Sequence, residues 1–113
     1  MGFQDAIISG FRSYATFTGR TPRSGYWYWV LFTMLGGLVT ATWDMVLMSG
    51  VQVTEPVFHL VTLLPTLAVA ARRLHDIDRS GWWQLLWFLP VIGWIILIVW
   101  HCKPGTPGAN RFG

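Results

Sequence analysis

Residues 72–83, with the sequence RRLHDIDRSGWW, concentrate charge in an otherwise apolar chain. Three arginines, two aspartates and one histidine fall within eight positions. Guanidinium groups bind phosphates and carboxylates through paired hydrogen bonds, and an imidazole beside a carboxylate is a general acid–base unit. Two chemistries are therefore open to this segment: anion binding by its arginines, and proton transfer by His75 with Asp76.

Charge pairing within a helix is a structural explanation for the same residues. If a helix continues past Ala71, Arg72 lies four positions before Asp76, and Arg79 lies three positions after it. Arginines also suit a helix C-terminus, whose carbonyl groups carry partial negative charge. Ser80 would then cap the next helix. Three arginines still outnumber two aspartates, so the anion site stays a hypothesis.

A second pair of arginines strengthens that hypothesis. Arg20 and Arg23 stand in the sequence GRTPR and precede the first apolar segment. Guanidinium groups that converge at the membrane surface would form a site for the phosphate of an anionic lipid headgroup. Because a neighbouring histidine and aspartate alone are a weak indication of catalysis, we assign no catalytic residue. The predicted anion, headgroup or partner site comprises Arg20, Arg23, Arg72, Arg73, His75, Asp76 and Arg79.

Two further ionisable residues, Asp44 and His59, lie within or beside apolar segments. Intramembrane charges are candidates for function by default, and both positions fall toward the same end of their predicted helices. We therefore consider them a possible intramembrane polar pair. Cys102 is the single cysteine, and the histidines lack the spacing of metal ligands, so we predict neither a metal site nor a cofactor.

The composition places the chain in a membrane. Apolar residues make up 53% and charged residues 12% of the 113 residues, whereas soluble domains average about 25% charged residues. The net charge of +3 does not indicate a nucleic-acid partner, because the basic residues flank apolar segments instead of forming a stripe. We predict an all-α integral membrane protein with one domain over residues 1–113.

Three apolar segments predict three transmembrane helices, over 26–48, 55–71 and 82–102, since about 20 residues cross a bilayer core. The second is short, because its apolar part, 57–71, spans only about 22 Å at 1.5 Å per residue. Pro65 and Pro90 predict kinks in the second and third helices. A re-entrant turn at LPVIGW is the alternative for the third.

The flanking segments are predicted to be interfacial or irregular. Within residues 1–24, Phe3, Ile7 and Phe11 repeat at helical spacing, which favours an amphipathic helix lying in the membrane interface. Residues 72–81 are predicted to form a charged cytoplasmic loop. The tail, residues 103–113, is rich in glycine and proline and predicts turns.

The distribution of positive charge predicts which side each segment occupies. Arginines precede the first span and fill the second loop, whereas the first loop has none, so the N-terminus and residues 72–81 are expected in the cytoplasm. Three full spans would place the tail outside, against the positive charges of Lys103 and Arg111. A re-entrant third segment would return the tail to the cytoplasm.

The segments YATFTGRTPRSGYWYW, RRLHDIDRSGWWQLLWFLPVIGW and CKPGTPGANRFG resemble the three signature blocks of the YhaH/YhaI-like family of small bacterial inner-membrane proteins, a domain of unknown function. The resemblance covers residues 14–113. It implies a multi-pass protein of a bacterial inner membrane and no established activity. The matching positions are Phe17, Gly19, Arg20, Arg23, Tyr26 and Trp27; Arg72 to Asp76 and Arg79 to Trp83; and Gly105, Gly108, Asn110, Arg111 and Gly113.

These observations predict a non-enzymatic accessory protein that binds anionic lipid headgroups or a larger membrane complex through its arginine-rich cytoplasmic face. A chain of this size buries little of its own surface, so we also expect a homo-oligomer or a subunit of a larger assembly. The alternative is an oligomeric transporter or channel that uses Asp44 with His59, or a membrane enzyme that uses His75 with Asp76.

Overall fold

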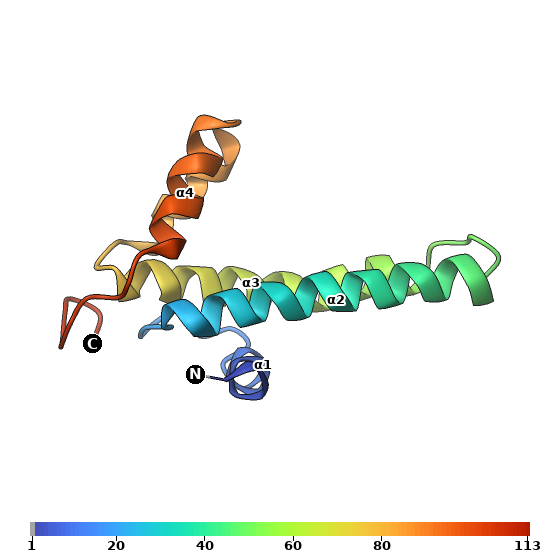
Figure 1. The fold of residues 1–113 in the computed structure, drawn as a ribbon, viewed down its shortest axis with the longest axis horizontal. Helices are drawn as coiled ribbons and strands as arrows, with labels where there is room; N and C mark the ends of the chain where they lie inside the picture. Colours follow the sequence, from blue (N-terminus) through green and yellow to red (C-terminus); the bar gives the residue numbers. More distant parts are fainter. Residues whose placement is uncertain (1) are drawn as a thin grey trace.

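A long helical hairpin forms the body of the protein, and shorter elements gather at one of its ends. The computed structural model describes residues 2–113, in which every regular element is helical: α1 (Phe3–Arg12), α2 (Arg23–Leu47), α3 (Thr54–Asp76), the 3₁₀ helix η1 (Gly81–Phe88) and α4 (Ile92–Cys102). Helices α2 and α3 lie side by side and antiparallel, while α1, α4 and the C-terminal tail lie toward the end where α2 begins and α3 ends (Figure 1).

The hairpin helices are the membrane-crossing candidates. Within residues 2–113, α2 and α3 are the two helices long and apolar enough to span a bilayer. At 1.5 Å per residue, the 25 residues of α2 extend about 37 Å, which exceeds a hydrocarbon core of about 30 Å. The far half of the hairpin carries exposed apolar side chains such as Leu38, Met45 and Leu60, as expected of a surface that faces lipid.

Aromatic and small side chains pack α2 against α3. Trp29 is buried and donates a hydrogen bond from Nε1 to Thr66 Oγ1 at 3.1 Å, and it packs in a cluster with Tyr26, Val69 and Ala70. Further along, the ring of Phe58 occupies the place that a side chain at Gly36 would fill. Close helix contact through small residues is the usual packing mode inside a membrane.

Pro65 lies inside α3, and the helix continues through it from Thr54 to Asp76. Proline has no N–H, so it leaves the carbonyl of Val61, four residues earlier, without its helical partner. The hydroxyl of Tyr14, in the linker between α1 and α2, donates to this carbonyl at 2.5 Å. Another segment of the chain therefore satisfies the group that the proline leaves free.

Helix α1 crosses the hairpin steeply: in Figure 1 it is seen almost end-on, whereas α2 lies in the plane of the picture. Phe11 makes edge contacts with Trp29 and Phe32, with ring centroids 5.2 and 5.7 Å apart. Gly10 lies directly against the Trp29 ring, where a larger residue would overlap it. The predicted helix at the N-terminus is present, and aromatic residues on one of its faces pack on α2.

The predicted single helix over 82–102 is wrong. The chain instead forms η1, reverses at Leu89–Val91 and returns as α4. The indole of Trp94 donates to the carbonyl of Trp87 at 2.9 Å, and the rings of Trp83 and Trp100 meet at 5.5 Å, so the two arms run antiparallel. Helix α4 has 11 residues, about 16 Å of helix, too short to cross a bilayer alone.

Pro90 and Gly93 account for this reversal. Pro90 cannot donate the backbone hydrogen bond that a continuous helix needs, and Val91 takes a positive φ of 64°. A side chain at Gly93 would overlap the carbonyl of Leu86, so this glycine lets the two arms approach. The proline that predicted a kink therefore ends one helix and begins the next. The reversal falls at LPVIGW, where we gave a turn as the alternative to a continuous helix.

The predicted charged loop over 72–81 also differs from the structure. Its first half, as far as Asp76, forms the last turns of α3, and residues 71–76 are buried. Ser80 caps η1 by accepting a hydrogen bond from the N–H of Trp82 at 3.3 Å, as the sequence predicted. The tail then returns to this end of the hairpin and lies beside the end of α3 (Figure 1).

Candidate functional site

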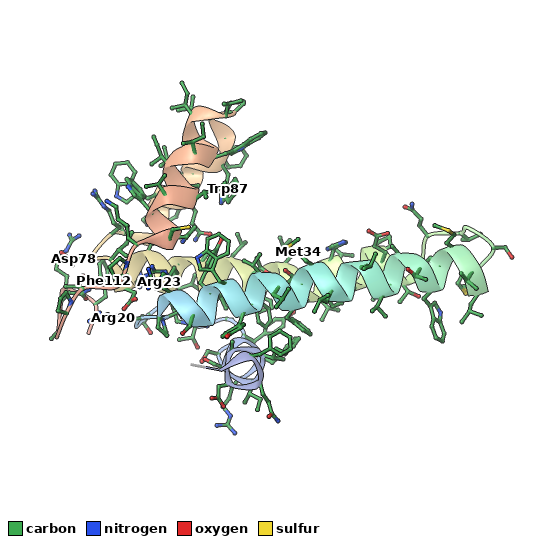
Figure 2. The ribbon with its side chains drawn as sticks, in the orientation of Figure 1. Arg20, Arg23, Met34, Asp78, Trp87 and Phe112 are labelled. Atoms are coloured by element: carbon green, nitrogen blue, oxygen red, sulfur yellow. The ribbon has the colours of Figure 1, made fainter. Side chains whose placement is uncertain are left out.

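The three signature segments meet at the last turns of α3. We call the group Arg20, Arg72, Arg73, His75 and Asp76 the polar cluster. It joins the linker before α2, the end of α3 and the C-terminal tail. Arg20, Arg23, Asp78 and Phe112 all lie at this end of the molecule, and Trp87 lies out on the η1–α4 arm (Figure 2).

Asp76 is the centre of charge pairing in the cluster. Its Oδ1 accepts from Arg20 Nε and its Oδ2 from Arg73 Nη1, each at 2.9 Å. The side chain of Arg73 is 0% exposed and that of Asp76 is 10% exposed. The sequence predicted pairing of Asp76 with Arg72 and Arg79. Its observed partners are instead Arg73, one turn earlier in α3, and Arg20, in the linker before α2.

Arg20 attaches the tail to the cluster. Besides Asp76, its guanidinium donates to the carbonyls of Gly108 and Thr106, both at 2.6 Å. The N–H of Thr106 donates in return to the carbonyl of Asp76 at 2.7 Å. Gly105 lies so close to the Asp76 carboxylate that an added Cβ would overlap it. The glycine-rich composition of the tail thus allows the backbone to approach a buried carboxylate.

Arg72 serves the linker between α1 and α2. Its Nε donates to the hydroxyl of Thr21 at 3.1 Å, and its Nη1 donates to the carbonyls of Ser13 and Thr16. The N–H of Thr21 donates to the carbonyl of Arg72 at 3.0 Å. Arg72 was predicted to bind an anion, but its guanidinium donates to acceptors of the same chain.

The end of α4 is held by Arg73, Arg23 and Trp27. Arg73 Nη2 donates to the carbonyls of His101, at 3.1 Å, and Lys103. Arg23 Nη1 donates to the carbonyl of Cys102, and Trp27 Nε1 to that of His101, each at 3.0 Å. The last carbonyls of a helix have no partner within the helix, and these donors supply it. The η1–α4 arm is thereby fixed to the start of α2.

His75 is held by three contacts, two to its ring and one to its backbone carbonyl. Its Nδ1 lies 2.9 Å from the carbonyl oxygen of Gly19. Because a carbonyl can only accept, Nδ1 carries the proton there. The ring stacks on Phe112 with centroids 4.0 Å apart and planes 3° apart. Asn110 donates to the backbone carbonyl of His75 at 2.9 Å. The Asp76 carboxylate is engaged by arginines, so the structure does not form the His75–Asp76 pair of the enzymatic alternative.

Arg23 and Arg79 are the exposed members of the predicted site. Arg79 lies over the ring of Trp100, with its Cζ 4.5 Å from the centroid. Arg23 lines a shallow hollow of about 280 Å³ with Ser24, Trp27 and Tyr28. The structure thus divides the predicted site into three arginines that are buried or half-buried in the fold and two that are exposed, of which Arg23 also bonds the carbonyl of Cys102.

Charge is separated along the hairpin. The eight lysines and arginines all belong to α1, the linker, the start of α2, the end of α3 or the segments after it, together with three of the five acidic residues. These parts carry a net charge of +5. The remaining acidic residues, Asp44 and Glu55, lie at the opposite end of the hairpin. Because the tail returns to the cluster, Lys103 and Arg111 join the other basic residues.

An exposed ion pair attaches the last residues of the tail. Arg111 donates from Nε to Asp78 Oδ1 at 3.1 Å, and from Nη2 to the carbonyl of Asp78 at 2.7 Å. The hydrogen bond from Arg111 lowers the pKa of the Asp78 carboxyl below its ordinary value. Both side chains remain accessible to solvent.

The predicted pair of Asp44 and His59 does not form. Asp44 is buried, and its carboxylate accepts from the backbone N–H groups of Val53, Thr54 and Glu55 at 2.9–3.1 Å. It therefore caps α3 from the neighbouring helix. His59 is exposed, and its Nε2 lies 3.5 Å from Glu55. These contacts give no proton path from one residue to the other.

Sequence reasoning missed two residues that complete the site. His101 is 1% exposed and stacks on Tyr26 with ring centroids 4.0 Å apart. Its ring nitrogens have no hydrogen-bond partner among residues 2–113. Thr21 is buried beside Arg72. The sequence contains no pattern that points to either residue, because their contact partners lie 51 to 75 positions away along the chain.

Comparison with known proteins finds relatives over most of the chain. Residues 14–113 match the sequence profile of a family described as a protein of unknown function (DUF805). The inner membrane protein YhaI of Escherichia coli K12 is 42% identical over 106 residues, covering 94% of this chain and 90% of YhaI. The inner membrane protein YhaH of the same organism is 41% identical, covering 96% and 93%. No solved structure matches the chain.

Proposed function

We propose that this chain, which belongs to the DUF805 family, is a non-enzymatic accessory protein of a bacterial inner membrane that binds anionic lipid headgroups. The observation that carries the proposal is the division of the arginines. Arg20, Arg72 and Arg73 donate to acceptors inside the fold. Arg23 and Arg79 lie on its surface beside aromatic rings, and one nitrogen of Arg23 also donates to the carbonyl of Cys102.

The proposed orientation follows from the charge separation. Positively charged segments remain on the cytoplasmic side of a membrane, so the N-terminus, the polar cluster and the tail face the cytoplasm. Helices α2 and α3 cross the bilayer. Helix α1 and the η1–α4 arm lie near the cytoplasmic interface, where tryptophan rings favour the headgroup level. The loop between α2 and α3 faces the opposite side.

The exposed arginines suit phosphate. Each guanidinium offers donors in a planar fork that matches two phosphate oxygens. The cytoplasmic leaflet attracts each nearby basic residue by about 1 kcal/mol. A neighbouring indole adds a ring that prefers the interface. A negative lipid would therefore be enriched around Arg23 and Arg79 relative to a zwitterionic lipid.

The test compares the lipids that accompany the full chain when it is extracted from mixed vesicles into polymer-bounded nanodiscs. Since 1.4 kcal/mol is a tenfold change, Arg23→Gln and Arg79→Gln should each lower the ratio of phosphatidylglycerol to phosphatidylcholine at the protein by up to about fivefold. Arg111→Gln is the control, because that arginine is paired with the carboxylate of Asp78, whereas no ion pair within residues 2–113 engages Arg23 or Arg79. Equal ratios in all variants would refute the proposal.

Association with further copies or with a larger membrane complex is part of the same proposal. The far half of α2 carries a shallow apolar hollow of about 510 Å³, lined by residues that include Leu38, Trp43 and Val46. Native mass spectrometry from mild detergent tests for assembly. A strictly monomeric species would limit the role to lipid binding.

A further inference from the structure

A groove runs between the end of α3 and η1, on a part of the molecule that the proposed headgroup site does not use. One hollow, of about 300 Å³, is lined by residues that include Ala71, His75 and Ser80. A second, of about 350 Å³, is lined by residues that include Leu67 and Phe88. The two hollows share four lining residues: Phe17, Gly81, Trp82 and Gln84. We call their union the α3–η1 groove.

The two ends of the groove differ in polarity. His75 and Ser80 line the end beside the polar cluster. Leu85, Trp87 and Phe88 line the other end. From His75 to Leu67 the groove follows eight residues of α3, which is about 12 Å. A long, mostly apolar hollow with polar groups at one end matches a molecule with a polar head and an apolar chain.

His75 turns a defined atom toward this groove. Its Nδ1 is bound to the Gly19 carbonyl and its ring is stacked on Phe112, so Nε2 is the nitrogen that remains. Nε2 lies 3.6 Å from the place that a Cβ at Gly81 would occupy, and Gly81 lines both hollows. In the neutral ring with its proton on Nδ1, Nε2 accepts a hydrogen bond. The preferred head therefore carries an N–H or O–H donor.

The apolar end opens where exposed side chains surround it. Phe88 is 83% exposed and Trp82 is 79% exposed, yet both line the groove. In a membrane protein such rings contact acyl chains, and each buried methylene contributes about 0.8 kcal/mol. The groove thus connects the cluster to the surface on which the lipid chains lie.

We infer that the α3–η1 groove binds one acyl chain of a membrane phospholipid, whose headgroup donates a hydrogen bond to Nε2 of His75. The inference requires the proposed membrane placement of the chain but not the binding of anionic lipid by Arg23 and Arg79. Phosphatidylethanolamine, whose ammonium group donates, is favoured over phosphatidylcholine, which has no N–H. The arrangement also assigns a role to Gly19, His75 and Phe112, one residue from each signature block.

The experiment uses the full chain in detergent micelles, where detergent covers the bulk of the apolar surface. One equivalent of phosphatidylethanolamine with a diazirine in its acyl chain is added, irradiated and mapped by peptide mass spectrometry. We expect adducts in residues 64–71 and 81–88. Leu67→Trp fills the groove and should reduce them at least fivefold. Leu60→Trp is the matched control, because Leu60 is on the same helix and 71% exposed.

A second pair of variants guards against misfolding and tests the headgroup contact. Leu85→Trp fills the same hollow from η1 and should also reduce the adducts. His75→Phe keeps an aromatic ring beside Phe112, and it should abolish the preference for phosphatidylethanolamine over phosphatidylcholine. Circular dichroism establishes that each variant keeps its helices.

Three results would overturn the inference. These are adducts spread equally over α2 and the groove, adducts unaffected by Leu67→Trp and Leu85→Trp in folded protein, and cross-links between two chains at the groove. Labelling of an Arg23→Gln/Arg79→Gln variant separates this inference from the proposed function. Groove labelling should persist in that variant even where the enrichment of anionic lipid is lost.

Discussion

Asp76→Asn is expected to destabilise the protein strongly. The carboxylate of Asp76 bonds Arg20 and Arg73, each at 2.9 Å, and Arg73 is fully buried. An asparagine keeps the shape of the side chain and one acceptor oxygen, but it removes the negative charge. Arg73 would then be a buried cation without a counter-ion. The single amide oxygen of the asparagine could accept a hydrogen bond from Arg20 or from Arg73, but it could not replace both carboxylate oxygens.

The expected cost follows from this burial. Removing one partner of a buried ion pair lowers the free energy of unfolding by about 3–5 kcal/mol, because the other charge is left uncompensated. Arg73 keeps its bonds to the carbonyls of His101 and Lys103, which places the expected loss at the lower end, about 3 kcal/mol. Marginal stabilities are about 5–15 kcal/mol, so the effect is a large part of the total.

The assay is reversible unfolding of the purified protein in mixed micelles of dodecyl maltoside and SDS, followed by tryptophan fluorescence. Asp78→Asn is the matched control, because it is the same change two residues away in an exposed pair, and we expect a much smaller effect. Adding Arg73→Met to Asp76→Asn removes the uncompensated charge and should recover part of the loss. A loss below about 1 kcal/mol for Asp76→Asn, the size expected of an exposed pair, would refute the reasoning.

Two further predictions concern the tail and the proline of α3. Arg111 lowers the pKa of Asp78, so their bond stabilises the tail above the ordinary aspartate pKa of about 3.9 and is lost as the pH falls through the lowered pKa. A spin label at residue 109 should therefore become more mobile at acid pH, and an Asp78→Asn chain should lack this transition; an unchanged transition would contradict the assignment. Tyr14→Phe should cost about 1 kcal/mol of unfolding free energy, and clearly less in a Pro65→Ala chain, whose new N–H can bond the carbonyl of Val61. Equal costs in the two backgrounds of this double-mutant cycle would show that the tyrosine hydroxyl does not compensate for the proline.

The helical class and the main hairpin could be predicted from the sequence, because they depend on local composition. Long apolar runs require helices in a membrane, since backbone groups must be paired internally. Ser80 was recognisable as a helix cap because its partner, Trp82, is two residues away. These predictions need no knowledge of which distant segments meet.

The pairing of Arg20 with Asp76 could not be predicted, because it joins distant segments, whereas the pairing of Arg73 with Asp76 lies within one helical turn and its spacing was present in the sequence. Arg20 and Asp76 are 56 positions apart, so helical spacing favoured the nearer Arg72 and Arg79 instead. Asp44 resembled an isolated intramembrane charge until α3 was placed beside it, where its carboxylate caps three N–H groups.

The third apolar segment shows a different limit of sequence analysis. Its 21 residues without a charge satisfy the length rule for a span, and that rule does not detect a reversal at Pro90. The positive charges of Lys103 and Arg111 were the opposing signal. They agree with a tail that lies beside Asp76 and Asp78.

The central claim is that the three signature segments meet on one side of the membrane, and cysteine accessibility tests it most directly. In a Cys102→Ser chain, single cysteines replace Thr18 in the linker, Gln52 in the α2–α3 loop and Ala109 in the tail, all of which are exposed. A membrane-impermeant maleimide is added to right-side-out and to inverted vesicles. We predict that positions 18 and 109 react together in inverted vesicles and that position 52 reacts in the opposite orientation. Labelling of position 109 together with position 52 would contradict the account and restore three full spans.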